Sequence, residues 1–112
     1  MKLIESLSVL SLSYSDQKIR FPSFVDVPFE ILDDFDNAFL SLPALIENGK
    51  FTKQEIAYIV RLHNLINITA SNPLLKNLEP EQFDASQEWN MIRDLAKKTL
   101  ELINRNKESV NE

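Results

Sequence analysis

The segment that begins at Phe51 carries the clearest structural signal in the chain. Thr52 and Glu55 have the spacing of a capping box, in which each side chain accepts a hydrogen bond from the other residue's backbone N–H group. Apolar residues then recur every three or four positions, which places them on one face of an α-helix. Pro73 follows and disfavours helix in the residue before it. The segment therefore predicts a helix over about 52–70 with one buried face.

Two other segments have helical spacing. One, over about 85–105, carries an apolar stripe formed by Trp89, Ile92, Ala96, Leu100 and Ile103. The other begins at Pro28, because proline is favoured in the first turn of a helix. Pro43 should break or restart this helix, and Asn48 with Gly49 supplies its C-terminal stop. We therefore expect well-defined helices on both sides of the capped segment.

The first 21 residues are compatible with two structures. Four apolar residues are spaced as on one helical face: Leu3, Leu7, Leu10 and Tyr14. Apolar residues also alternate with serines in the second half of this segment, which fits a short hairpin that turns at Ser15 and Asp16. We favour a helix over 2–13. An extended connector over 21–27 should follow it, because Pro22 lies within this segment and Pro28 directly follows it.

The N-terminus also bears on location. Lys2 and the apolar residues after it resemble the start of a signal peptide, but Glu5 and several serines interrupt the hydrophobic run. We therefore predict no signal peptide and a cytoplasmic location. No apolar stretch approaches the roughly 20 residues needed to cross a bilayer, so we expect no membrane association.

Together these segments predict an all-α fold, a four- to five-helix bundle. A chain of 112 residues has the usual size of one domain, so we expect a single helical domain over 1–112 with a frayed tail at 105–112. The helices over 52–70 and 85–105 should pack antiparallel, joined by a loop over 73–83 with a short turn of helix. The predicted core consists of Phe29, Leu32, Phe39, Leu45, Ile56, Ile59, Val60, Ile66, Trp89, Ile92, Ala96, Leu100 and Ile103.

The composition excludes several classes of function. The chain has no cysteine, which rules out disulfides, thiolate catalysis and cysteine-bound metals. It has one glycine and one histidine, too few for a phosphate-binding loop or the usual acid–base and metal sites. With 12 Lys and Arg against 17 Asp and Glu, its net charge of −5 has the wrong sign for binding phosphates. We therefore predict no enzyme, no cofactor, no metal and no direct contact with nucleic acid.

Three isolated features have structural explanations. His63, flanked by leucines, fits a residue at the edge of the core with one ring nitrogen hydrogen-bonded. Trp89 fits a core residue that closes the bundle near its loop end. Asp34 and Asp36 are spaced like the first ligands of a calcium loop, but the turn glycine and the closing glutamate are missing. We expect none of these residues to bind a metal or to act in catalysis.

The charge distribution is the most unusual feature. From Phe21 to Gly49 the chain has six acidic residues and no Lys or Arg, so a total of −5 leaves +1 for the remainder. On a helix that starts near Pro28, four polar residues share one side, here called the acidic face: Glu30, Asp33, Asp34 and Asn37. The opposite side is apolar, with Phe29, Leu32, Phe35 and Phe39. The candidate partner-binding residues of the whole segment are Asp26, Glu30, Asp33, Asp34, Asp36, Asn37 and Glu47.

Such a face has an energetic cost. Like charges three or four residues apart on a helix repel by about 0.2–0.5 kcal/mol per pair, and the helix dipole offsets this only in the first turn. Two explanations remain open. The face is either a solvated surface that promotes solubility or a docking surface whose field attracts a basic partner.

The layout of the chain resembles a known family. Two helical segments, FTKQEIAYIVRLHNLI and EWNMIRDLAKKTLELI, follow the acidic helix. This order over roughly residues 28–104, with a Trp-x-x-Ile-Arg-x-x-Ala pattern at 89–96, resembles small bacterial toxin-immunity proteins, including some that protect against contact-dependent growth inhibition toxins. The resemblance implies a protein that binds a cognate toxin domain, often a nuclease with a basic active site, and neutralises it by covering that site or a neighbouring surface. It transfers no individual binding residue.

The sequence thus leads to two hypotheses from different classes. In the first, an acidic helical protein neutralises a basic protein partner, most concretely as an immunity protein that inhibits a bacterial toxin. In the second, a helical adaptor or oligomerisation domain associates through apolar residues such as Trp89, Phe35 and Phe39, and the acids only increase solubility. A small enzyme ranks third. Salt separates the first two, because it screens exposed charges and leaves apolar association largely unchanged.

Overall fold

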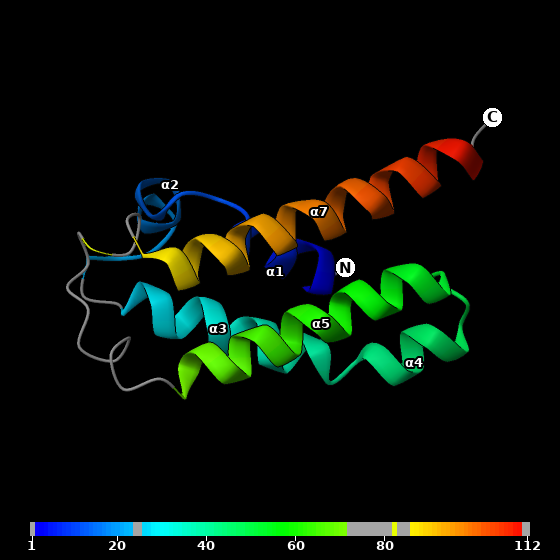
Figure 1. The fold of residues 1–112 in the computed structure, drawn as a ribbon, viewed down its shortest axis with the longest axis horizontal. Helices are drawn as coiled ribbons and strands as arrows, with labels where there is room; N and C mark the ends of the chain where they lie inside the picture. Colours follow the sequence, from blue (N-terminus) through cyan, green and yellow to red (C-terminus); the bar gives the residue numbers. More distant parts are fainter. Residues whose placement is uncertain (1, 24–25, 72–81, 83–85, 111–112) are drawn as a thin grey trace.

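The all-α fold predicted from the sequence is confirmed by the computed structural model, which describes residues 2–23, 26–71, 82 and 86–110 (Figure 1). Within these residues the chain forms six helices and no strand. The helices are α1 (Lys2–Leu10), α2 (Tyr14–Ile19), α3 (Val27–Phe39), α4 (Leu42–Glu47), α5 (Lys53–Ala70) and α7 (Gln87–Val110). Because α2 and α4 have only six residues each, the other four helices build the bundle.

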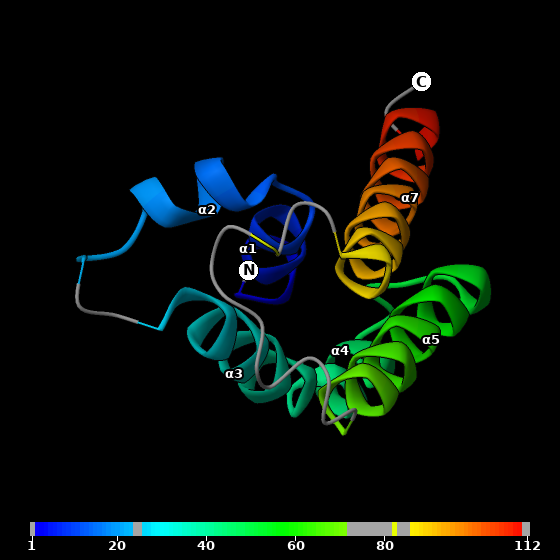
Figure 2. The ribbon, with the colours of Figure 1, turned by 60° about the vertical axis from the view of Figure 1, so that its left-hand side comes forward.

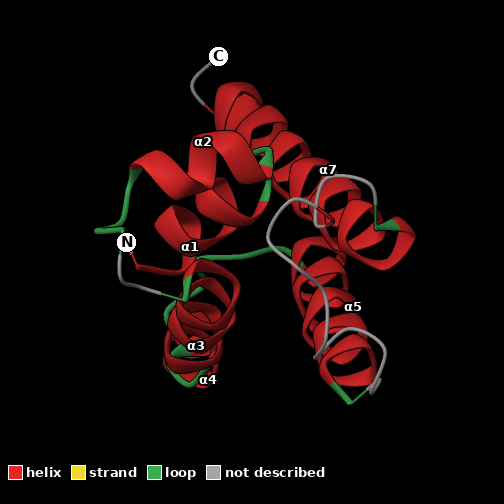
Figure 3. Ribbon diagram, turned by 90° about the vertical axis from the view of Figure 1, so that its left-hand side faces the viewer, coloured by secondary structure: helices red, strands yellow, loops and turns green. Residues whose placement is uncertain are grey.

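The four longer helices form a ring. α5 and α7 pack against each other and run antiparallel, as predicted (Figure 1). α1 packs against both α7 and α3 (Figure 2), and α3 closes the ring with a smaller contact on α5. Viewed end on, α1 and α3 therefore lie on one side and α5 and α7 on the other (Figure 3).

Local signals determine the helix ends. The capping box is formed, since the Glu55 N–H donates to Thr52 Oγ1 at 3.1 Å and the Thr52 N–H donates to Glu55 Oε1 at 2.6 Å. The Asp26 side chain caps α3 by accepting a hydrogen bond at 3.2 Å from a backbone N–H three residues further on. α4 begins at Leu42 with Pro43 in its first turn. Gly49 follows the C-cap Asn48 with a φ of 68°, which glycine adopts without strain.

The N-terminal segment differs from its prediction. The helix expected over 2–13 ends already at Leu10. A second helix, α2, begins at Tyr14, and Ser13 caps it by accepting a hydrogen bond from the Asp16 N–H at 3.3 Å. The alternative hairpin is wrong, since Ser15 and Asp16 lie inside α2.

Two buried polar side chains stabilise the corner between α1 and α2. Gln17 of α2 donates from Nε2 to the Val9 carbonyl at 2.9 Å, and Arg93 of α7 donates from Nε to the Leu12 carbonyl at 2.8 Å. The Val9 carbonyl also accepts from the Leu12 N–H at 3.1 Å, so backbone and side-chain donors together satisfy the carbonyls of this corner. The corner is therefore built by tertiary contacts, which single-segment periodicity does not reveal.

The core draws on every helix except α2. Its buried apolar residues are Leu3, Leu7, Leu10, Val27, Ile31, Phe35, Ala38, Leu42, Ile59, Leu62, Ile66, Trp89, Ile92 and Ala96. Five of the predicted core residues are among them: Ile59, Ile66, Trp89, Ile92 and Ala96. Five more are partly buried and pack against this core: Leu32, Phe39, Leu45, Leu100 and Ile103. Ile56 is also only partly buried.

Two predicted core residues are on the surface instead. Phe29 is 62% exposed, because α3 turns its stripe of Val27, Ile31 and Phe35 inward against the neighbouring helices. Val60 is 36% exposed, because α5 buries the side that carries Ile59 and not the adjacent one. In both cases the helix is correct and its rotation about its own axis differs from the prediction.

The last helix is longer than predicted. α7 continues to Val110, through residues 105–110 where the sequence predicted a frayed tail. The predicted loop over 73–83 lies outside the described residues, apart from Gln82. The connector over 21–27 is described in part, and its last residue already belongs to α3. None of the described helices is long and apolar enough to span a membrane.

Candidate partner-binding surface on α3

The rotation of α3 decides which of its side chains reach solvent. Its buried stripe, Val27, Ile31, Phe35 and Ala38, belongs to the core that α1, α5 and α7 share. The residues of the acidic face lie outside this stripe. Asp33 is exposed on the solvent side, and Asp34 and Asn37 lie at the edge of α3 that faces α1.

The structure brings the four residues of the acidic face together. Asp33, Asp34 and Asn37 are exposed and Glu30 is partly buried, all within two turns of α3. The Asn37 side-chain amide donates from Nδ2 to Asp33 Oδ2 at 3.4 Å. Among the described residues, no lysine or arginine lies within 4 Å of the Asp33 or Asp34 carboxylate. No ion pair among the described residues therefore neutralises the Asp33 and Asp34 carboxylates.

The other three predicted site residues occupy separate positions. Asp26 is the N-cap of α3, and its carboxylate accepts a hydrogen bond from a backbone N–H in the first turn of that helix. Glu47 is exposed in the last turn of α4, on a different helix from the acidic face. Asp36 lies on the flank of α3 that meets α5, where Asp36 Oδ1 is 3.8 Å from His63 Nε2. The candidate surface therefore reduces to the acidic face itself.

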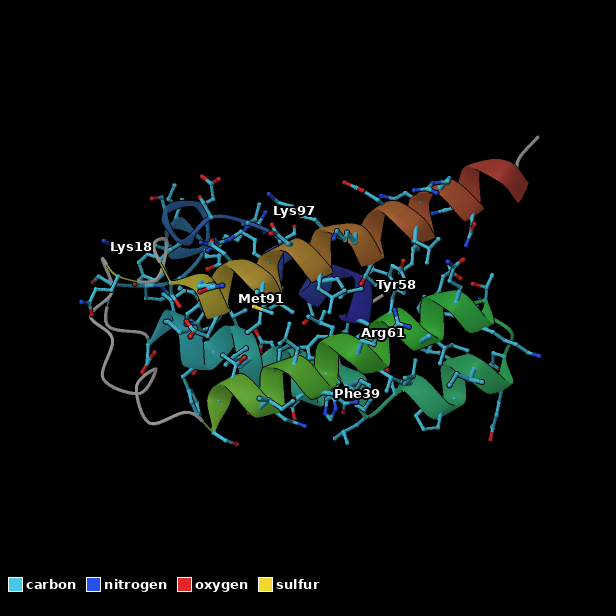
Figure 4. All side chains as sticks on the ribbon, in the orientation of Figure 1. Lys18, Phe39, Tyr58, Arg61, Met91 and Lys97 are labelled. Atoms are coloured by element: carbon cyan, nitrogen blue, oxygen red, sulfur yellow. The ribbon has the colours of Figure 1, made fainter. Side chains whose placement is uncertain are left out.

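His63 joins α3 to α5. Its ring stacks on Phe39 with a centroid distance of 3.9 Å and an interplanar angle of 8°, and Phe39 lies beside α5 (Figure 4). On the other side of the ring, Asn67 Nδ2 is 3.5 Å from His63 Nδ1, so Nδ1 accepts and Nε2 faces Asp36. The residue is partly buried at the edge of the core, as the sequence predicted.

This arrangement leads to a prediction about α3–α5 packing. Replacing His63 with alanine removes the stacked ring and should lower the free energy of unfolding by about 1–2 kcal/mol. Replacing Asp36 with asparagine should change it by no more than about 0.5 kcal/mol, because exposed ion pairs contribute little. Urea denaturation of both variants measures the difference. A larger loss for Asp36→Asn than for His63→Ala would show that charge, not stacking, holds α3 to α5.

Two exposed apolar side chains flank the acidic face. Phe29 is 62% exposed and Leu40 is 77% exposed. Phe29 lies four residues before Asp33, and Leu40 lies three residues after Asn37, so both adjoin the acids on the helix surface. The sequence analysis assigned Phe29 to the core and gave Leu40 no role, so it missed both residues. Aromatic side chains are enriched in interfaces, so the exposed Phe29 is a candidate anchor beside the acids.

The described residues offer no metal site. Nowhere among them do three His, Asp or Glu side chains lie close enough together to hold an ion. The acids of α3 point outward along a helix, which keeps their carboxylates from converging on one point. Whatever the acidic face binds must therefore cover it from outside.

Comparisons with known proteins identify no relative. No protein-family model, no curated protein and no solved structure matches this chain.

Proposed function

We propose that this protein binds and neutralises a basic protein partner through the acidic face of α3. The observation that carries the proposal is the cluster of carboxylates at Glu30, Asp33 and Asp34. No Lys or Arg of the described residues lies within 4 Å of the two exposed carboxylates, those of Asp33 and Asp34. Their mutual repulsion costs stability in the free protein. A partner's Lys and Arg side chains relieve that cost on binding, and the field of the face speeds the encounter.

The concrete form of the proposal is an immunity protein that inhibits a bacterial toxin. A toxin that cleaves nucleic acid binds a polyanion, and Lys and Arg side chains on its substrate-binding surface supply affinity for the phosphates. The acidic face is complementary to such a site or to the surface beside it. Phe29 and Leu40 supply apolar contacts next to the charges, which helps to exclude water from the interface. An inhibitor of this kind acts where its toxin acts, so we place it in the cytoplasm.

The adaptor hypothesis has less support. Of the three apolar anchors named for it, Trp89 and Phe35 lie in the core and Phe39 stacks on His63. These side chains hold the bundle together, so an adaptor would have to rely on other exposed residues. Phe29 and Leu40 are such residues, but they adjoin the acidic face and serve the first proposal equally well.

Affinity capture from the source cell tests the function. The purified protein and its Asp33→Lys/Asp34→Lys variant are used as bait at about 50 and 300 mM salt, with Debye lengths of roughly 14 and 6 Å. We expect the unmodified bait to retain one basic protein at low salt, less of it at high salt, and the variant to retain little. The captured protein should arrest growth when expressed alone and be harmless when co-expressed with this chain.

A different outcome contradicts the proposal. If the main captured protein is acidic or neutral, and is retained equally at both salt concentrations and by both baits, the acidic face is a solvated surface. The adaptor hypothesis would then explain the association.

A further inference from the structure

A cavity of about 420 Å³ lies between α1 and α3. Its walls are partly apolar, with Val9 of α1 facing Ile31 and Ala38 of α3. Asp34 and Asn37 line it as well, and because both are exposed they stand at its mouth. The cavity is therefore continuous with the acidic face. Its size falls in the range of roughly 300–1,000 Å³ that small-ligand pockets occupy.

Ser6 supplies a buried polar group in this cavity. The residue lines it and is only 7% exposed, yet its hydroxyl has no hydrogen-bond partner among the described residues. The neighbouring Ser8 behaves differently, since its hydroxyl donates to the Ile4 carbonyl at 3.0 Å within the same helix. Buried polar groups are nearly always hydrogen-bonded, so the hydroxyl of Ser6 indicates a ligand that forms a hydrogen bond with it.

The charged groups that line the cavity determine which charge the ligand can carry. Two carboxylates, Glu5 and Asp34, line the cavity against one ammonium group, Lys2. Asn37 donates its Nδ2 to Asp33, which leaves its carbonyl oxygen as a further acceptor. Acceptors therefore outnumber donors, and the net charge of the lining is negative. An anionic ligand is disfavoured, and a metal ion finds no cluster of three ligands in the described part of the chain.

We propose that this cavity takes an arginine side chain of the basic partner, an inference that rests on the proposed function and names the contact at its centre. The guanidinium group carries five N–H donors and no acceptor, which suits a lining of two carboxylates, an amide carbonyl and a hydroxyl. Its three-carbon stem can pack on Val9, Ile31 and Ala38.

Binding of a single capped arginine tests the cavity. N-acetyl-L-arginine methylamide is titrated into the ¹⁵N-labelled full chain at about 50 mM salt, where the Debye length is roughly 14 Å. We expect saturable shifts centred on the amides of Ser6 and Asn37. The Ser6→Val variant fills the space and removes the hydroxyl, and should weaken binding at least fivefold. The Lys2→Gln variant removes a like charge and should strengthen it.

Matched controls separate the cavity from general charge effects. Ser8→Val makes the same substitution two residues away on the exposed side of α1 and should leave the affinity unchanged. The citrulline analogue has the same shape without the charge and should not bind. Thermal unfolding of both valine variants confirms that they are folded. Equal affinities of Ser6→Val and the unmodified chain for the capped arginine overturn the proposal, as do shifts that leave Ser6 unaffected.

The two proposals fail in different ways. Suppose that a hexa-arginine peptide binds the Ser6→Val variant as tightly as the unmodified chain but binds the Asp33→Lys variant more weakly. This result overturns the proposed arginine site in the cavity and supports binding at the acidic face. Capped arginine that binds through Ser6, in a chain that captures no basic protein, keeps the guanidinium site and overturns the proposed function. Free arginine that binds more tightly than the capped form shows that the site serves a small molecule, which overturns the assignment to a partner's side chain.

Discussion

Replacing Ile92 with alanine is expected to lower the free energy of unfolding by about 2–5 kcal/mol. Ile92 is fully buried in α7, within the core that this helix shares with α1 and α5. Truncation removes apolar contacts on several helices at once and leaves a cavity that the bundle can refill only in part. Because a domain of this size has roughly 5–15 kcal/mol of stability in total, the variant should be close to unfolding at moderate urea concentrations.

Met91 provides the matched control for this prediction. It is the preceding residue of the same helix and is 50% exposed, so Met91→Ala removes a comparable number of atoms from a largely solvated position. We expect a loss of at most about 1 kcal/mol for it, because surface substitutions rarely cost more. Urea denaturation of the two variants, monitored by helical circular dichroism, gives both values. A loss below about 0.5 kcal/mol for Ile92→Ala would contradict the core described above.

The parts of the fold that the sequence predicted are those with local causes. The cap of α5 depends on Thr52 and Glu55, three residues apart, and both hydrogen bonds form. Pro43 lies in the first turn of α4, where proline is favoured, and Gly49 follows the end of that helix with a positive φ. None of these signals needs a distant partner. They could therefore be recognised in one segment at a time.

The errors have non-local causes. Which side of α3 is buried depends on where α1 lies, and the sequence left the structure of the first 21 residues open. Phe29 was therefore assigned to the core and Ile31 was not, although the structure exposes the first and buries the second. α2 is a second example, because its position is supported by Gln17 and Arg93, which bond to carbonyls of other segments.

The candidate site divides in the same way. The spacing of Glu30, Asp33, Asp34 and Asn37 predicted their common face, and the structure places them on one side of α3. The contact of Asp36 with His63 could not be predicted, because it requires the packing of α3 on α5. The Ser6 cavity was also missed, although one signal was present. Ser6 lies on the same helical stripe as the three buried leucines of α1. A polar residue on an apolar stripe indicates a hydrogen-bond partner in the interior.

Reversing the charge of Asp33 and Asp34 is expected to have the largest effect on partner binding. Lysine at both positions changes the net charge of the acidic face by +4. It should weaken the complex by about 2 kcal/mol or more, roughly 30-fold in Kd, because close charge pairs in interfaces have couplings of at least about 1.5 kcal/mol. The fold should persist, since both side chains are exposed and replacing them relieves repulsion along α3. Calorimetry with the captured partner at two salt concentrations measures the change.

The control makes the same change of charge elsewhere. Asp94→Lys/Glu101→Lys also adds +4, at exposed positions of α7. If the whole-molecule field alone governed association, both double variants would weaken the complex equally, and salt would erase both effects. A docking surface at the acidic face requires a larger loss for the Asp33/Asp34 pair, part of which persists at higher salt because buried pairs are screened less. An unchanged affinity of that pair would show that the acids of α3 serve solubility alone, and the repulsion between them would then be the cost of a solvated surface.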